Sequence, residues 1–214
     1  AARLGFRCHI FEPGANPPAG QVADQVTTAA YDDKDALARF AASVDVITYE
    51  FENIPTSALD TLEALRPITP NREALRTSQD RTTEKAFPTS LGLKTAPYAD
   101  VNSEDDLHKA VEKIGTPAIL KTCRLGYDGK GQARLNSEAD LAQAWADMSG
   151  AASVLEGFIS FTKEVSIIAA RSPSGEVSCF DPGENIHKNG ILATTTVPAQ
   201  IGPKLRTDAV LLAA

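Results

Sequence analysis

A glycine-rich turn between two short predicted strands constrains the fold of this 214-residue chain more than any other stretch. The apolar run 117–120 predicts a buried strand that ends at Lys121, and the alternating run 132–135 predicts a returning strand. Three glycines lie between the strands: Gly126, Gly129 and Gly131. Glycine tolerates positive φ and lets backbone N–H groups approach an anion closely. The stretch therefore predicts a flexible antiparallel hairpin with a lysine at the end of its first strand.

The spacing of this turn differs from that of two common phosphate loops. It is not a Walker A loop, which ends in Gly-Lys-Ser/Thr and opens a helix, and it is not the dinucleotide fingerprint. A two-stranded flap over phosphates fits better, and protein kinases use the same physical solution. A lysine at the end of the first strand adds a point charge suited to phosphate. From these residues alone, a plain hairpin without a ligand stays an open alternative.

Composition narrows the class of protein. With 43% hydrophobic and 23% charged residues, the chain has apolar material for one large or two small cores. The net charge is −7 and no basic block is present, so nucleic acid is not an expected partner. No apolar run has the length of a membrane span, and no membrane partner is expected. The three cysteines are scattered, which indicates a reducing compartment, here the cytoplasm.

The first half of the chain alternates predicted strands and helices, which indicates an α/β layer with a parallel sheet. Ligands of such sheets collect beyond the carboxyl ends of the strands. Glu50 and Glu52 follow the predicted strand 44–48, and a period of two aims both to the same side. Two solvated loop carboxylates and a site that needs negative charge are both compatible with this pattern.

The stretch 71–91 predicts two helices, with Asp80 as the cap of the second. Arg81 lies just inside that cap and is an ordinary surface arginine unless a phosphate lies nearby. Residues 93–97 predict a linker, and we expect the domain boundary within 92–100, with the chain divided as 1–92 and 93–214. The second half, residues 93–214, predicts an α+β domain with antiparallel hairpins, and within it 184–187 is expected to be a loop.

Several short motifs follow one another along the chain. They are Asp80-Arg81, Ile119-Leu120-Lys121, the turn 126–132, Glu156-Gly157, Lys163-Glu164-Val165-Ser166 and Asn185-Ile186-His187. In this order and spacing the chain resembles the ATP-grasp enzymes. Thr-Tyr-Glu-Phe-Glu-Asn at 48–53 and the Gly-Tyr-Asp-Gly form of the turn favour one branch, the 5-(carboxyamino)imidazole ribonucleotide synthases. The resemblance covers essentially the whole chain.

This resemblance implies a partial Rossmann-like preATP-grasp domain at 1–92 and an α+β ATP-grasp domain at 93–214. Lys121 would contact ATP phosphates, the turn would close over them, the segment 156–159 would meet adenine, and Glu164 would accept from the ribose hydroxyls. The implied ATP-binding residues are Arg81, Lys121, Gly126, Tyr127, Asp128, Gly129, Lys130, Gly131, Gln132, Glu156, Gly157, Phe158, Ile159, Glu164 and His187.

The implied activity is that of an ATP-dependent ligase that forms a C–N bond in purine (IMP) biosynthesis. Bicarbonate is phosphorylated by ATP, and the carboxyphosphate, or carbon dioxide released from it, is captured by the amine of 5-aminoimidazole ribonucleotide. Tyr127, Asp128 and Lys130 would face this substrate as catalytic residues, with Glu50 from the first domain. The resemblance also implies Mg²⁺, with Mn²⁺ as a substitute, and a homodimer.

Both ends of the sequence predict a fragment. The chain begins in the tail of a predicted helix and ends inside a helical pattern. The glycine-rich first turn of the family is expected before Ala1 and the metal-binding carboxylates after Ala214, so no metal ligand is expected within the chain. We therefore expect little activity from the isolated chain. ATP consumption that depends on aminoimidazole ribonucleotide and bicarbonate would refute this expectation.

Two rival functions remain on the sequence alone. One is another ATP-grasp carboxylate–amine ligase, such as the formate-using glycinamide ribonucleotide transformylase or a biotin carboxylase. The other is a non-catalytic nucleotide-binding module that kept the fold. A panel of substrates separates the first, and the presence or absence of metal ligands separates the second.

Overall fold

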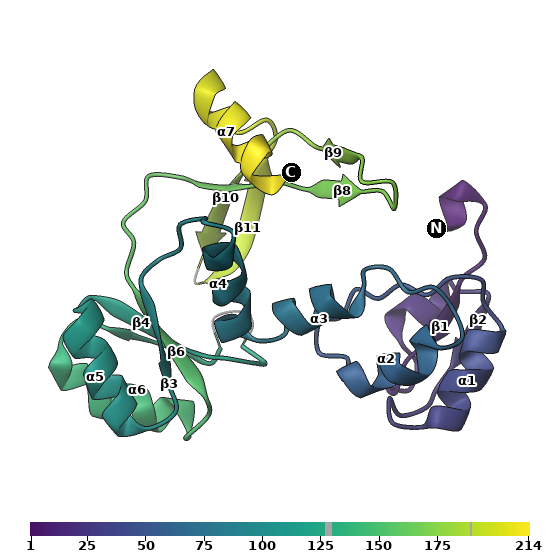
Figure 1. Ribbon diagram of the computed structural model, residues 1–214, viewed down its shortest axis with the longest axis horizontal. Helices are drawn as coiled ribbons and strands as arrows, with labels where there is room; N and C mark the ends of the chain where they lie inside the picture. Colours follow the sequence, from purple (N-terminus) through teal and green to yellow (C-terminus); the bar gives the residue numbers. More distant parts are fainter. Residues whose placement is uncertain (127–129, 189) are drawn as a thin grey trace. The chain divides into compact units, whose positions relative to one another are not determined.

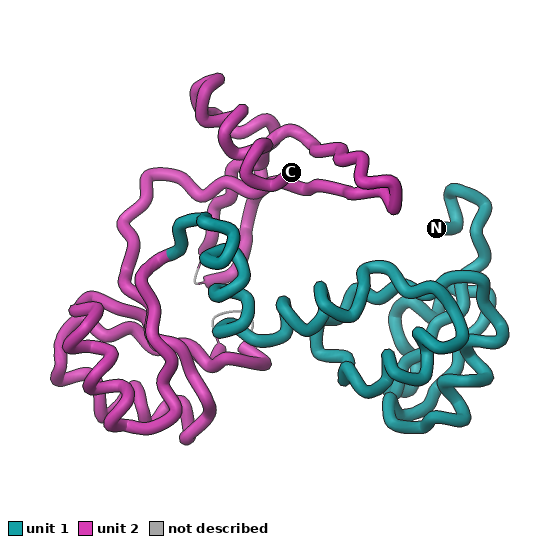
Figure 2. The backbone as a smooth tube through the Cα atoms, viewed as in Figure 1, with its two compact units in different colours: residues 1–95 teal, residues 96–214 magenta. Residues whose placement is uncertain are grey.

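The computed structural model describes residues 1–126, 130–188 and 190–214. It divides into two compact units, residues 1–95 and 96–214, which Figure 2 draws in different colours. Each unit has its own hydrophobic core.

Unit 1 combines two short parallel strands with four α-helices. β1 (His9–Phe11) pairs with β2 (Gln25–Thr27) in a parallel register. The helices are α1 (Lys34–Ala42), α2 (Thr56–Glu63), α3 (Arg72–Ser78) and α4 (Arg81–Ser90), and the 3₁₀ turns are η1 (Ala2–Leu4) and η2 (Pro18–Gln21).

Local signals account for where these helices begin. The Asp33 carboxylate accepts from the N–H of Ala36 at 2.9 Å and caps α1. The Asp80 carboxylate accepts from the N–H groups of Thr82 and Thr83 and caps α4, as predicted. The buried faces of α1, α2 and α3 then form one apolar cluster with Ile47: Leu37, Phe40, Ala41, Ala58, Leu59, Leu62 and Leu75.

The predicted strand 44–48 is present only as a single parallel bridge between Ile47 and Ile68. The N–H of Ile47 donates to the carbonyl of Pro67 at 2.9 Å, and its carbonyl accepts from Thr69 at 3.0 Å. Val46, next to it, is 61% exposed, so the prediction of a continuous buried strand was wrong.

Unit 2 is built on a four-stranded antiparallel sheet in the order β3-β6-β4-β5. The strands are β3 (Tyr98–Val101), β4 (Ala118–Thr122), β5 (Gln132–Leu135) and β6 (Ser153–Gly157). The helices α5 (Glu104–Ile114) and α6 (Leu141–Met148) lie together beside this sheet, and the 3₁₀ turn η3 (Glu138–Asp140) precedes α6 (Figure 1). Their inward residues close over fully buried strand residues such as Leu120, Leu135 and Leu155.

A smaller three-stranded antiparallel sheet has the order β11-β10-β7. Its strands are β7 (Glu164–Ser166), β10 (Gly183–Lys188) and β11 (Ile191–Thr196). The hairpin β8 (Ala169–Arg171) and β9 (Val177–Cys179) and the helix α7 (Pro203–Ala213) complete the unit.

The expected loop at 184–187 was wrong, because this segment is the central strand β10. Asn185 pairs with Glu164 on one side and with Thr195 on the other. Pairing with partners on both sides holds a polar segment extended, although its own residues carry little strand signal.

Candidate functional site

The two faces of the four-stranded sheet differ in character. Ala118 and Leu120 of β4 are fully buried in the core that α5 and α6 cover. Because side chains alternate along a strand, Ile119 and Lys121 emerge on the opposite face. Their direct cross-strand neighbours share that face: Gln132 and Arg134 on β5, and Val154 and Glu156 on β6. The face turned away from the core therefore carries the charged side chains.

Lys121 and Glu156 form an ion pair on this face. The ammonium Nζ donates to Glu156 Oε2 at 3.1 Å, and the side chains are only 23% and 13% exposed. Partial removal from water strengthens the attraction between opposite charges. An ammonium group has three N–H donors, so Lys121 can keep this contact and still bind an anion. Both residues are among the predicted ATP-binding residues, and the structure brings them together.

At the end of β6 and directly after it, two backbone N–H groups are already occupied. The N–H of Gly157 donates to the carbonyl of Pro97 at 2.9 Å, and the N–H of Phe158 donates to Pro117 at 3.0 Å. Within the predicted adenine segment 156–159, the N–H of Ile159 donates to no backbone carbonyl of the described residues, so it is available to a ligand. Its side chain is 50% exposed and offers an apolar contact.

Arg134 was missed by sequence reasoning. Its guanidinium carbon lies 4.3 Å from the centroid of the Phe158 ring, a cation–π contact beside the same segment. The alternation of side chains along β5 puts Arg134 on the charged face. Its partner Phe158 comes directly after β6 and lies far from Arg134 in the sequence, so no local pattern indicates the contact. The contact fixes the Phe158 ring, which was predicted to lie near adenine.

The glycine-rich turn closes against β4 at Gly131. The N–H of Thr122 donates to the Gly131 carbonyl at 2.8 Å, and Gly131 has φ +64°. A Cβ on Gly131 would lie 2.6 Å from Thr122 Oγ1, so only glycine fits there. Gly126, Lys130 and Gln132 of the turn are among the described residues, whereas the predicted Tyr127, Asp128 and Gly129 lie outside them.

The three-stranded sheet brings two further predicted residues together. His187 Nδ1 lies 3.4 Å from Glu164 Oε1, and both side chains are partly exposed, 37% and 42%. The arrangement offers a carboxylate acceptor and an imidazole to the same ligand. Arg81, the remaining predicted ATP-binding residue, is the first residue of α4 in unit 1 and is half-buried.

Within this sheet, Glu184 of β10 accepts hydrogen bonds from two donors. Its carboxylate accepts from Lys163 Nζ at 2.8 and 2.9 Å and from the N–H of Gln200 at 3.1 Å. The hydrogen bond from Lys163 is the main reason that the pKa of Glu184 is lowered, the Gln200 N–H adds to it, and burial opposes both. The Glu184 carboxylate thereby connects β10 with the loop after β11, in which Gln200 lies.

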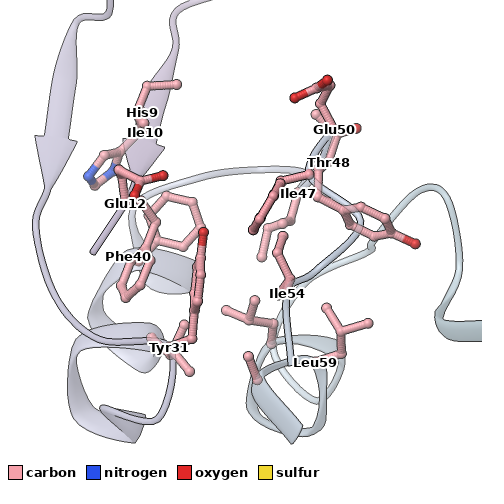
Figure 3. A pocket seen from close by; sticks show the side chains of 16 residues that line it. His9, Ile10, Glu12, Tyr31, Phe40, Ile47, Thr48, Glu50, Ile54 and Leu59 are labelled. Carbon is pink, nitrogen blue, oxygen red and sulfur yellow. The ribbon is translucent and has the colours of Figure 1, made fainter. Parts of the chain in front are cut away.

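Unit 1 contains a cavity of about 250 Å³ between β1 and the segment 47–51, above α1 and α2 (Figure 3). Its depth is apolar, with Phe40, Ile47, Ile54 and Leu59 facing the hollow (Figure 3). Polar groups line it elsewhere, and the predicted Glu50 lies at the end away from the helices (Figure 3). A polar ligand would therefore contact the rim, not the depth.

Two other carboxylates, Glu52 and Glu12, differ in their relation to this cavity. Glu52 was expected on the same side as Glu50, but it does not line the cavity, because the chain turns at residues 52–53. Glu12, which the sequence did not single out, does line it. Burial is the main cause that raises the pKa of Tyr31, another lining residue, and the Glu12 charge raises it further.

Within the ranges that the structure describes, no three His, Cys, Asp or Glu side chains cluster as a metal site would require. Searched over the same residues, the helices include none with the length and apolarity needed to cross a membrane.

Comparison with known proteins identifies the family. The model of the ATP-grasp domain matches residues 86–214, more than half of the chain. The chain belongs to the ATP-grasp family. The model of the ribonucleotide synthetase preATP-grasp domain matches residues 1–79. The predicted family and the predicted pair of domain types are thus confirmed.

Individual relatives are close in sequence and structure. The N5-carboxyaminoimidazole ribonucleotide synthase of Brucella melitensis is 53% identical over 203 residues, which are 94% of this chain and 56% of that protein. The Bacillus subtilis enzyme of the same name is 41% identical over 213 residues, 100% of this chain and 56% of that protein. The chain therefore spans about half the length of the curated relatives it matches.

Two solved structures match nearly the whole chain. The Staphylococcus aureus N5-carboxyaminoimidazole synthetase complexed with ADP has a TM-score of 0.92 and 36% identity, and covers 99% of this chain and 57% of that one. The Aspergillus clavatus synthase in complex with ADP and 5-aminoimidazole ribonucleotide has a TM-score of 0.88 and 25% identity, with coverages of 99% and 56%.

Proposed function

We propose that this chain takes part in the ATP-dependent carboxylation of 5-aminoimidazole ribonucleotide with bicarbonate, which yields 5-(carboxyamino)imidazole ribonucleotide in purine biosynthesis. The Lys121–Glu156 pair beside a glycine-rich hairpin, on the sheet face turned away from the core, carries this proposal. The names of the relatives and the ligands named for their solved structures support it.

The nucleotide is assigned to unit 2. Lys121 binds the phosphates and the turn 126–132 covers them, while Gly131 allows the close approach of backbone that this needs. The Ile159 N–H reads the adenine edge, and Glu164 accepts from the ribose hydroxyls. His187 completes the proposed set of nucleotide ligands in unit 2, and Arg81 is the one proposed ligand that belongs to unit 1.

The acceptor amine is assigned to Glu50 together with Tyr127, Asp128 and Lys130, two of which lie outside the described residues. A bicarbonate oxygen attacks the γ-phosphorus and ADP leaves. The substrate amine then attacks the carboxyl carbon, phosphate leaves, and Asp128 takes the amine proton. Carboxyphosphate hydrolyses readily, so the flap must exclude water until capture.

Further assignments rest on the family. Mg²⁺ would accompany the triphosphate and neutralise its charge. The described residues offer no cluster of metal ligands, so no step is assigned to the metal here. We also propose a homodimer in the cytoplasm, a reducing compartment in which the thiols of Cys8, Cys123 and Cys179 would stay reduced.

Calorimetric titration of the chain with ATP, 5-aminoimidazole ribonucleotide and glycinamide ribonucleotide tests the proposal. The first two should bind and the third should not. Binding of glycinamide ribonucleotide in place of the aminoimidazole would favour the formate-using ligase. Binding of ATP with neither acceptor would favour a nucleotide-binding module without this activity.

A further inference from the structure

A row of polar side chains crosses the sheet β11-β10-β7. The register places Asn185 directly opposite both Glu164 and Thr195, so all three side chains emerge on one face. Thr195 Oγ1 donates to Asn185 Oδ1 at 2.9 Å, and Asn185 Nδ2 donates to Glu164 Oε1 at 3.3 Å. The outer strand is thereby linked to the carboxylate by two hydrogen bonds.

The hydroxyl of Thr195 determines which way the Asn185 amide points. The Ser166 hydroxyl also reaches Asn185 Oδ1, at 3.5 Å. If the amide were rotated, its oxygen would face the Glu164 carboxylate and the two acceptors would repel each other. Two hydroxyl donors on Oδ1 therefore keep the amide N–H₂ on Glu164.

Gly183 is a second, independent feature that allows Thr195 to contact Asn185. Gly183 lies two residues before Asn185 on β10, so a side chain at this position would emerge on the same face as that of Asn185. A Cβ there would lie 2.7 Å from Thr195 Cγ2 and 3.5 Å from Val197 Cγ2. A larger residue would push Thr195 away from Asn185, so glycine is required for this contact.

The row leaves one carboxylate oxygen of Glu164 available. Oε1 accepts from Asn185 and lies 3.4 Å from His187 Nδ1. Counting residues 1–126, 130–188 and 190–214, Oε2 has no hydrogen-bond partner, and the side chain is 42% exposed. An oriented acceptor facing solvent suits a ligand hydroxyl.

We propose that Asn185 and Thr195 are positioning residues, which orient the Glu164 carboxylate so that Oε2 accepts from the ribose hydroxyls of the nucleotide. This proposal rests on the proposed function, because it takes the nucleotide site as given. Neither residue touches the nucleotide, so their loss should weaken recognition of the sugar and leave the contacts to base and phosphate intact.

The test compares the affinities of ATP and 2′,3′-dideoxy-ATP, which lacks both hydroxyls, for the 214-residue chain and its variants. Thr195→Val removes the donor and keeps the shape. It should weaken ATP binding about fivefold and leave dideoxy-ATP binding unchanged. Thr195→Ser should keep the preference for ATP, and Asn185→Leu should reduce it as Thr195→Val does.

Thr194→Val is the matched control. Thr194 is the preceding residue of β11 and pairs with Ile186, so its side chain emerges on the other face. This variant should bind both nucleotides as the unchanged chain does.

Each alternative outcome overturns the proposal in a recognisable way. Equal losses for both nucleotides in Thr195→Val would show a structural role only, and unchanged affinities would show no role. If the unchanged chain bound both nucleotides equally, Glu164 would not read the ribose. If it bound neither, the proposed nucleotide site itself would fail and this proposal with it.

Discussion

Lys121 shows how a single side chain can serve both the fold and a ligand. Its ammonium lies 3.1 Å from a Glu156 carboxylate that is only 13% exposed. A carboxylate so shielded from water needs a cation or donors near it. A cation that pairs with Glu156 in the free protein is thus the residue assigned to the phosphates.

Replacement of Lys121 by Met should therefore have two separable effects. Loss of the cation should lower ATP affinity about tenfold or more, and the shielded carboxylate should lower the free energy of unfolding by about 1–2 kcal/mol. Adding Glu156→Gln should recover the stability but not the affinity. Calorimetry and chemical denaturation measure the two quantities.

Lys113→Met is the control for this pair, since Lys113 is exposed on α5, which packs on the other face of the sheet. It should change neither quantity. Full recovery of ATP affinity in the double variant would contradict the assignment of Lys121 to the phosphates.

Glu184 leads to a prediction about pH. Its pKa in the folded state is held below the ordinary value of 4.5, chiefly by Lys163 and then by the Gln200 N–H. The charged form therefore stabilises the fold above pH 4.5, and this contribution is lost as the pH falls through the folded-state pKa. Glu184→Gln should be less stable than the unchanged chain at pH 7, and the difference should shrink in acid.

Urea denaturation of both proteins between neutral and acidic pH measures this difference. A gap in unfolding free energy that stayed constant as the pH fell below 4.5 would contradict the role assigned to the carboxylate charge.

At the scale of elements, helices were easier to predict than strand pairing. Asp33, Asp80 and Ser103 each mark a helix start by a contact with a residue two or three positions away, which a sequence displays directly. β10 was mistaken for a loop because its pairing partners are about ten and twenty residues away.

The residues of the candidate site also differ in how far the sequence alone predicts them. Motif order predicts Lys121, Glu156 and Glu164 as well as the segment 156–159. Which N–H of that segment is available to a ligand emerges only once the acceptors of the Gly157 and Phe158 N–H groups are known. The contact between Arg134 and Phe158 depends on tertiary packing that no local pattern encodes.

The glycine turn supplies a prediction at this scale. Gly131→Ala should destabilise the chain by about 2–3 kcal/mol, because the residue has φ +64° and its Cβ would meet Thr122 Oγ1 at 2.6 Å. Gly150→Ala shares the positive φ, +72°, but its Cβ would meet nothing within 4 Å, so it should cost only about 1 kcal/mol.

Thermal unfolding of the two alanine variants measures the contrast. Thr122→Ala should reduce the loss caused by Gly131→Ala, because it removes the clashing hydroxyl. Equal destabilisation at positions 131 and 150 would contradict the close approach of the turn to β4.

At the scale of the whole molecule, the two units carry different parts of the proposed reaction. Unit 2 holds Lys121, Glu156 and Glu164, and unit 1 holds Glu50 at the rim of its cavity. The apolar depth of that cavity is a poor site for a triphosphate. The nucleotide should therefore bind to unit 2 and leave the cavity of unit 1 largely unaffected.

Hydrogen–deuterium exchange of the chain with and without saturating ATP, read peptide by peptide, tests this assignment most directly. We predict slower amide exchange in the stretches 118–126, 131–135 and 153–166, and unchanged exchange at 9–12 and 47–51. Protection confined to the residues around the unit 1 cavity, or ATP binding that left β4, β6 and β7 unprotected, would contradict the nucleotide site.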